Sequence, residues 1–299
     1  MRILVTGGTG FIGSNIVAAL IKLGHDVIIT GHDSEQKIPG FKGTMLQPSF
    51  VGLDWNALGH LDAVVHEAAI NDTQSRNVSE MIRANVDSSL ALFEYAAKQG
   101  CKNIVYASST AVYGKGPAPY MENQELHPLN AYAESKKQLE EEASLFAKAN
   151  PEITCLGLRY CNVYGPGESH KGNRASMIYQ LARQMRTGNP RLFKYGEQRR
   201  DYIYVRDVVS ANMRALEAKK SAIVNCGSGI SMSFNDLVRI LNGVLGTDRT
   251  PEYFDNPIES AYQNHTECDM SLAKETIGFI PKYDIERGIR DYMRSGLGV

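Results

Sequence analysis

Tyr132 and Lys136, four positions apart, are the pair of side chains best suited to acid–base chemistry. The pattern over residues 131–150 predicts a helix, so both side chains would leave the same face of it. An ammonium group beside a phenol favours the phenolate and lowers a tyrosine pKa that starts at about 10. We therefore expect Tyr132 to take a proton from a hydroxyl group while a hydride leaves the same carbon. The alternative is a surface helix that carries a tyrosine and a lysine by chance.

Hydroxyl side chains are expected close to this pair. The apolar run over residues 103–107 predicts a buried strand, and it is followed by Ser108, Ser109 and Thr110. Open α/β sheets bind ligands at the carboxyl ends of their strands. Ser109 and Thr110 are therefore candidate substrate contacts.

A glycine-rich turn near the start of the chain predicts a dinucleotide site. The segment Thr6-Gly7-Gly8-Thr9-Gly10-Phe11-Ile12-Gly13 follows a short apolar strand and opens a helix. Glycines at these positions permit a tight turn and close approach of the backbone to a pyrophosphate, which the helix N-terminus would face. A glycine-rich turn without a ligand is the alternative interpretation.

The end of the second strand bears on the choice of dinucleotide. An acidic residue there accepts hydrogen bonds from the ribose hydroxyls of NAD, whereas this chain has Gly31 followed by His32. The missing carboxylate favours NADP, whose extra phosphate His32 or Lys37 would meet. Asp33 lies close enough to keep NAD open as the alternative.

The order of elements predicts an α/β fold with a doubly wound parallel (Rossmann) sheet. Predicted strands alternate with helices, as such sheets require, at residues 3–5, 27–29, 62–66, 103–107 and 153–158, with long helices at 78–99 and 131–150. We expect residues 1–165 to form a dinucleotide-binding domain. Residues 166–299 are expected to form a smaller α/β substrate lobe, some segments of which cross back, with helical patterns at 175–187, 207–219, 234–245 and 285–294.

Composition excludes several other classes. The 32 basic and 33 acidic residues nearly balance, which argues against a nucleic-acid partner, and no apolar run approaches the roughly 20 residues needed to span a membrane. The start of the chain breaks too soon for a signal-peptide core, so we expect a cytoplasmic protein. Five scattered cysteines without a CxxC pair argue against a disulfide scaffold and a metal site: Cys101, Cys155, Cys161, Cys226 and Cys268.

Taken together, five motifs resemble the extended short-chain dehydrogenase/reductase family, whose members mostly act on nucleotide sugars. The motifs are TGGTGFIG, HEAA (66–69), YASSTAVYG (106–114), YAESK (132–136) and RYCNVYGPG (159–167). The resemblance implies that Ser109 orients the substrate hydroxyl, Tyr132 is the acid/base, and Lys136 holds the tyrosine and the nicotinamide ribose. It further implies cofactor contacts at Gly7, Gly10, Phe11, Ile12, Gly13, Asp54, Ala68 and Ala69, with Asn85 supporting the nearby loop.

Within the family, residues 162–172 are similar to enzymes that epimerise an ADP-activated heptose at C6. That resemblance implies a second acid/base at Lys171, because inverting a carbon through a ketone needs proton transfer on both faces. A solvated loop lysine or a phosphate contact is the alternative. The resemblance also places Asn162, Arg200 and Tyr262 against the nucleotide sugar, with Arg200 on its diphosphate.

Several rival functions share these residues. A UDP-hexose 4-epimerase would use the same serine, tyrosine and lysine, with Lys171 as the discriminator. A nucleotide-sugar reductase would consume its cofactor, and a catalytically dead dinucleotide-binding protein would have no use for Ser109, Tyr132 and Lys136. A 4,6-dehydratase is disfavoured because Ala111 and Val112, not carboxylates, follow Thr110. Family members usually pair through their two long helices, so we expect a homodimer or a larger homo-oligomer.

Overall fold

A computed structural model describes residues 1–31, 38, 40–46, 58–72, 77–257 and 262–295. His32, Lys37 and Asp54, for which the sequence predicts cofactor contacts, lie outside these residues. None of the helices in the described part combines the length and the apolar character of a membrane span.

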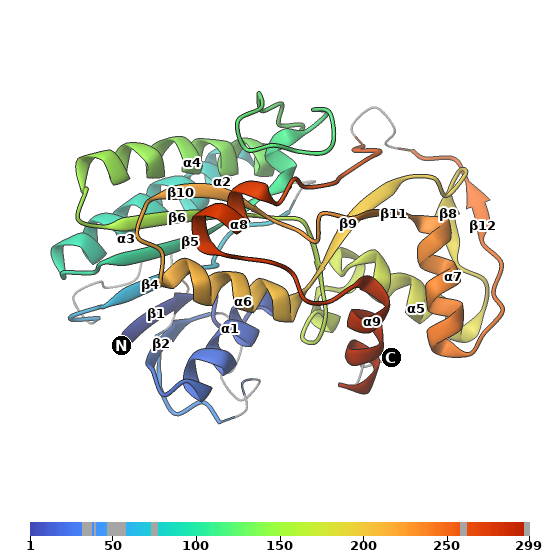
Figure 1. Cartoon of the computed structure of the whole chain (residues 1–299), viewed down its shortest axis with the longest axis horizontal. Helices are drawn as coiled ribbons and strands as arrows, with labels where there is room; N and C mark the ends of the chain where they lie inside the picture. Colours follow the sequence, from blue (N-terminus) through green and yellow to red (C-terminus); the bar gives the residue numbers. More distant parts are fainter. Residues whose placement is uncertain (32–37, 39, 47–57, 73–76, 258–261, 296–299) are drawn as a thin grey trace.

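A seven-stranded parallel sheet forms the larger part of the molecule (Figure 1). Its strand order is β10-β6-β5-β4-β1-β2-β3, and neighbouring strands run parallel throughout. The strands are β1 (Arg2–Thr6), β2 (Asp26–Thr30), β3 (Thr44–Leu46), β4 (Ala63–His66), β5 (Asn103–Ser109), β6 (Thr154–Tyr160) and β10 (Ala222–Cys226). The predicted doubly wound sheet is confirmed.

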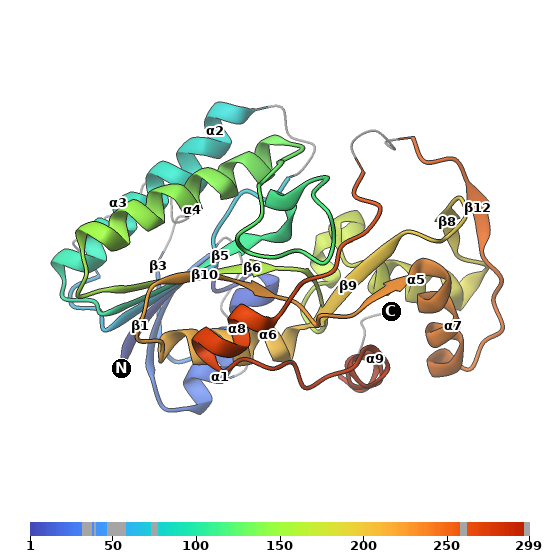
Figure 2. The same ribbon diagram turned by 45° about the horizontal axis from the view of Figure 1, so that its top comes forward.

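Helices cover both faces of this sheet. In β1, Ile3 and Val5 pack on one face, whereas Leu4 packs on the other, which explains why the strand is apolar throughout. The first face carries α1 (Phe11–Lys22), α6 (Val205–Leu216) and α8 (Ser271–Ile277). The second carries α2 (Val78–Ile82), α3 (Ser88–Lys98) and α4 (Ala131–Ala149), which lie together above the sheet in Figure 2.

The helix predicted over residues 78–99 is interrupted, which corrects the sequence interpretation. A π-helical turn, Arg83–Asp87, separates α2 from α3. It contains Asn85, which is buried and hydrogen-bonds the backbone of Ile70. Such turns often occur at functional sites, and periodicity alone does not reveal them.

In the part of the chain that the structure describes, the smaller lobe contains two short sheets and three helices around its own core. The strands are β7 (Asn162–Tyr164), β9 (Arg199–Tyr204) and β11 (Ser231–Ser233) in one sheet, with β8 (Arg191–Phe193) and β12 (Glu252–Phe254) in the other. The helices are α5 (Met177–Thr187), α7 (Phe234–Leu245) and α9 (Ile285–Arg294). A 3₁₀ segment, η5 (Ser169–Arg174), precedes α5, and another, η4 (Thr110–Tyr113), directly follows β5 of the large sheet. The helices predicted at 234–245 and 285–294 have the predicted bounds, whereas α5 and α6 each begin two residues away from their predicted starts.

The two lobes are not consecutive in sequence. Strand β10 completes the large sheet beside β6, and α6 and α8 pack against that sheet, although all three follow residue 165. The boundary between residues 165 and 166 stays a prediction.

One cysteine pair is present that the sequence does not predict. Cys161 and Cys268 are joined as a disulfide with their Cα atoms 7.5 Å apart, and Asp201 lies beside them. The Asp201 carboxylate already accepts hydrogen bonds from the backbone of Ser228, Gly229 and Cys268. These contacts join the end of β6 to the segment that leads into α8.

Candidate active site

The glycine turn leads from β1 into the first turn of α1. Gly7 has a φ of +64°, and a Cβ on it would lie 2.9 Å from the backbone nitrogen of Ala68. A Cβ on Gly13 would collide with the Gly7 carbonyl oxygen. No side chain caps the helix at Gly10, so its first N–H groups remain available to an anion. The turn is therefore shaped for a pyrophosphate.

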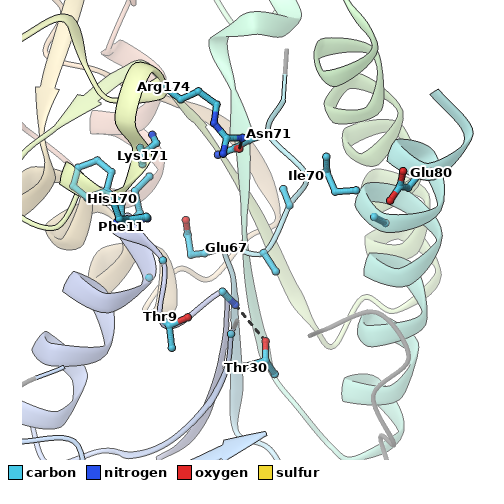
Figure 3. A pocket seen from close by; sticks show the side chains of 18 of the residues that line it. Thr9, Phe11, Thr30, Glu67, Ile70, Asn71, Glu80, His170, Lys171 and Arg174 are labelled. Atoms are coloured by element: carbon cyan, nitrogen blue, oxygen red, sulfur yellow. Dashed lines mark hydrogen bonds between the residues drawn. The ribbon is translucent and has the colours of Figure 1, made fainter. Parts of the chain in front are cut away.

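A cavity of about 570 Å³ opens above this turn (Figure 3). It is lined by the predicted cofactor contacts Gly7, Gly10, Phe11, Ile12, Gly13, Gly31, Ala68 and Ala69. Its volume lies within the range of ligand pockets, and the missing Cβ atoms provide the close backbone approach that a dinucleotide requires. The residues present fit such a cofactor, and we call this cavity the dinucleotide groove.

Other groove residues were not predicted from the sequence. They are Thr9, Thr30, Glu67, Ile70, Asn71, Glu80, Arg83, Ala84, His170 and Arg174. The glycine motif contains Thr9 and the HEAA motif contains Glu67, so both had a signal in the sequence. The remainder come from the β2 end, the segment after β4, the α2–π-turn region and η5, which only the fold brings together.

Gly31 is glycine for a steric reason. A Cβ at this position would collide with the Thr9 hydroxyl oxygen. Thr30 beside it helps to hold the turn, because its side-chain oxygen accepts a hydrogen bond from the Gly7 N–H at 3.3 Å. Packing against Thr9 thus excludes an acidic side chain at this end of β2.

The Ser109, Tyr132 and Lys136 side chains meet where β5 ends beside α4. Ser109 hydrogen-bonds Tyr132 through their side chains. Lys136 is 2% exposed, and its Nζ donates to the Ala107 carbonyl oxygen at 2.7 Å. The Nζ atom lies 5.9 Å from the centroid of the Tyr132 ring. The sequence correctly predicts that the three residues lie together.

The predicted lowering of the tyrosine pKa is wrong for the protein alone. Burial raises the pKa of Tyr132 to about 12, the hydrogen bond from Ser109 acts to lower it, and the charge of Glu67 raises it further. Burial also lowers the pKa of Lys136 to about 8 against the opposing charges of Glu67 and Glu140. Desolvation thus dominates the pKa of both side chains.

Asn85 holds the loop that forms one edge of the groove. Its Oδ1 accepts from the Ile70 N–H at 2.8 Å, and its Nδ2 donates to the Ile70 carbonyl at 2.9 Å. The same Nδ2 donates to Ser135 in α4 at 3.0 Å. The π-turn thus connects the groove loop to the helix that carries Tyr132.

Lys171 enters the groove from η5. Its Nζ lies 5.4 Å from the centroid of the Phe11 ring, and Figure 3 shows both at one wall of the cavity. Burial lowers the pKa of Lys171, opposed by the charge of Glu168. Tyr132 and Ser109 do not line this groove, so the structure places Lys171 on the cofactor's side of the site.

The predicted substrate contacts already interact with other groups of the protein. Thr110 is buried and donates to the Tyr160 carbonyl, and the Asn162 Nδ2 donates to the Asp201 carbonyl. Arg200 is 8% exposed, and its guanidinium carbon lies 4.7 Å from the centroid of the Tyr262 ring. Arg200 and Tyr262 thus come together, as expected for a shared ligand contact.

Comparison with known proteins agrees with this geometry. Residues 3–227 match the model of the NAD dependent epimerase/dehydratase family. The chain is 34% identical, over 97% of its length and 96% of the relative, to an ADP-L-glycero-D-manno-heptose-6-epimerase from Alkalilimnicola ehrlichii.

Solved structures of two nucleotide-sugar epimerases match nearly the whole chain. ADP-L-glycero-D-manno-heptose-6-epimerase from Helicobacter pylori matches with a TM-score of 0.90 and 33% identity, covering 100% of this chain and 96% of that one. UDP-glucose 4-epimerase from Thermotoga maritima matches with a TM-score of 0.89 and 30% identity, covering 99% and 100%. With a glycine turn, a dinucleotide groove and a Ser-Tyr-Lys cluster in one fold, this chain belongs to the NAD dependent epimerase/dehydratase family.

Proposed function

We propose that this chain is an epimerase of a nucleotide-activated sugar and that its substrate is an ADP-glycero-manno-heptose, inverted at C6. The observation that carries the heptose assignment is the similarity to two heptose epimerases, 34% and 33% identical over nearly the whole of each chain. The burial of Lys171 beside Phe11 in the dinucleotide groove is compatible with it. A UDP-hexose 4-epimerase is the second candidate, supported by the match to the enzyme from Thermotoga maritima.

Bound nicotinamide would supply a reversible hydride acceptor, which allows the C6 carbinol to pass through a ketone. Ser109, already hydrogen-bonded to Tyr132, would orient the hydroxyl on that carbon. Tyr132 would remove the hydroxyl proton as the C6–H bond breaks. Because burial keeps this phenol protonated, additional positive charge is needed to make it a base, and the oxidised cofactor and Lys136 would provide that charge.

Lys171 would serve the opposite face of the ketone. As the C–H bond reforms on that face, Lys171 would give its proton to the oxygen, and the two residues would exchange roles in the reverse reaction. A lysine needs a lowered pKa for this task, and burial of Lys171 acts in that direction. Arg200 would bind the diphosphate, with Tyr262, Asn162 and Thr110 forming the surrounding substrate site.

For the cofactor we propose NADP, with NAD as the alternative. Gly31 carries no carboxylate that would repel an additional ribose phosphate, and steric contact with Thr9 keeps the position small. Two neighbours, MoeE5 and a UDP-glucuronic acid 4-epimerase from Bacillus cereus, were solved with NAD. We further propose a homodimer that pairs through α3 and α4.

The test is proton NMR of the purified protein with ADP-D-glycero-D-manno-heptose in deuterated buffer, without added cofactor. We expect conversion to the L-glycero epimer with no deuterium incorporated on carbon, and no conversion by Tyr132→Phe. Failure to convert this sugar, with bound cofactor verified in the sample, would reject the heptose assignment. Conversion of UDP-hexoses in its place would establish the second candidate.

A further inference from the structure

Glu168 is a fully buried acidic residue directly before η5, the segment that carries Lys171. None of the six residues of η5 itself is buried, so Glu168 differs sharply from the segment that it precedes. Acidic side chains are seldom fully buried unless strong partners surround them. The partners of Glu168 therefore indicate what its carboxylate does.

The carboxylate joins the two ends of the loop around η5. Its Oε1 accepts from the Gly165 N–H at 3.1 Å and from the Ser176 hydroxyl at 3.0 Å. Its Oε2 accepts from the Ser176 N–H at 2.6 Å. Gly165 precedes Lys171 in the chain and Ser176 follows it, so a single side chain closes the loop that carries the lysine.

Two helices of the smaller lobe hold the same carboxylate. Ser176 is the N-cap of α5, so the negative charge of Glu168 lies at the positive end of that helix. Tyr292 in α9, which is itself buried, hydrogen-bonds Glu168 through its side chain. Glu168 thus ties the η5 loop to both α5 and α9.

Lys171 extends from the first turn of this closed loop. Its backbone N–H donates to the Glu168 carbonyl at 2.9 Å. From that turn the side chain reaches the dinucleotide groove, where Nζ lies 5.4 Å from the centroid of the Phe11 ring (Figure 3). The backbone and the side chain of Glu168 therefore fix the turn from which Lys171 enters the groove.

A carboxylate suits position 168 better than an amide does. Each of its oxygens receives a backbone N–H, one from either end of the loop. Glutamine has one acceptor oxygen, so its amide nitrogen would face one of these two donors. Glu168→Gln would therefore open the loop on one side and change the volume of the side chain very little.

We propose that Glu168 is a positioning residue for the second acid/base: by fastening both ends of the η5 loop, it holds Lys171 at the face of the ketone opposite Tyr132. This inference deepens the proposed function and rests on it. Oxidation of the D-glycero epimer passes the hydroxyl proton to Tyr132, whereas oxidation of the L-glycero epimer passes it to Lys171. In both cases the hydride from C6 goes to the bound oxidised nicotinamide. Glu168 should therefore matter for the L-glycero epimer alone.

Stopped-flow absorbance of the holoprotein, which follows reduction of the bound nicotinamide, separates the two half-reactions. In Glu168→Gln we expect the L-glycero epimer to react about 100-fold more slowly, because a small displacement of a reacting group costs about that much. The D-glycero epimer should react at the wild-type rate, which also shows that the variant is folded. An equal loss for both epimers, or no loss for either, would overturn the proposal.

The matched control is Asp207→Asn. Asp207 is likewise buried, and it accepts from two backbone N–H groups, those of Lys282 and Tyr283. It fastens the segment before α9 and not the η5 loop, so both half-reactions should retain their wild-type rates. A selective loss for the L-glycero epimer in this variant as well would show that closure of the η5 loop is not the cause.

Amide hydrogen exchange, followed by NMR without sugar, tests the closure of the loop directly. In Glu168→Gln the N–H of Gly165 or of Ser176 should exchange about tenfold faster, because it loses its acceptor. Asp207→Asn should leave both exchange rates unchanged. Unchanged exchange at both groups in Glu168→Gln would refute the proposal. If neither epimer reacts with the wild type, the heptose assignment fails, and the exchange rates still decide whether Glu168 closes the loop.

Discussion

Lys136 and Tyr132 leave the same face of α4, yet the ammonium group of Lys136 is directed to the Ala107 carbonyl, 5.9 Å from the centre of the phenol ring. The lysine is therefore anchored to β5 rather than paired with the phenol oxygen. This arrangement explains why the spacing of the two residues does not lower the pKa of Tyr132, which burial raises to about 12.

Lys171 should be required for turnover, whereas an ordinary surface lysine should not. Replacing Lys171 with Met removes the proposed second acid/base, and general acid–base groups typically contribute about 10²- to 10⁴-fold. Steady-state kinetics should show a loss of kcat of that size. The control is Lys115→Met, at an exposed loop lysine, which should retain wild-type kcat. Equal kcat values for the two variants would contradict a role of Lys171 as the second acid/base.

Gly31→Asp should weaken binding of both dinucleotides. Any side chain at Gly31 collides with Thr9, so an added carboxylate distorts the turn before it can reach a ribose. We expect at least a tenfold rise in Kd for NAD and NADP, about 1.4 kcal/mol, measured by calorimetry on the cofactor-free protein. Gly188→Ala is the matched control, because a Cβ there meets nothing within 4 Å. Tight NAD binding with loss of NADP binding alone would contradict this steric account.

The buried pair of Glu140 and Arg159 should contribute strongly to stability. Two hydrogen bonds of 2.7 and 2.8 Å join the side chains, and both residues are almost fully buried. Glu140→Gln leaves the guanidinium group without its counter-charge, so the free energy of unfolding should fall by about 3–5 kcal/mol. The exposed pair of Glu286 and Arg290 provides the comparison, where Glu286→Gln should cost less than about 1 kcal/mol. Urea titration of both variants measures the difference, and similar losses would refute the role of burial.

Glu67 should also make stability depend on pH. Its pKa is higher in the folded chain, about 7, than the ordinary 4.5, so the folded state binds more protons between these values. The free energy of unfolding of the wild type should therefore fall, relative to Glu67→Gln, as the pH rises from 4.5 to 7. Above that window the difference should level off. Urea titrations at each pH would show a constant difference if Glu67 kept its ordinary pKa.

The elements that the sequence predicts well are those whose signals are local. Continuous apolar runs mark β1 and β5 because parallel strands are covered on both faces, and glycines mark the turn between β1 and α1 because a Cβ would collide there. The Tyr132–Lys136 spacing is likewise contained in one helix.

The features that were missed depend on contacts between distant segments. The π-turn at Asn85 is tied to the loop at Ile70, and α8 is too short to display a helical period. The hydrogen bond between Glu67 and Tyr160 joins residues 93 positions apart. Desolvation of Tyr132 arises only in the folded chain, so neither its pKa nor the position of Lys171 against Phe11 follows from spacing.

Turnover of ADP-D-glycero-D-manno-heptose carrying deuterium at C6, in ordinary water, tests the central claim most directly. If hydrogen leaves C6 as hydride and returns to the opposite face, the L-glycero product retains the deuterium at C6, as seen by mass spectrometry and NMR. Product that has exchanged its C6 deuterium with water would contradict transient oxidation, and the absence of product would contradict the heptose assignment.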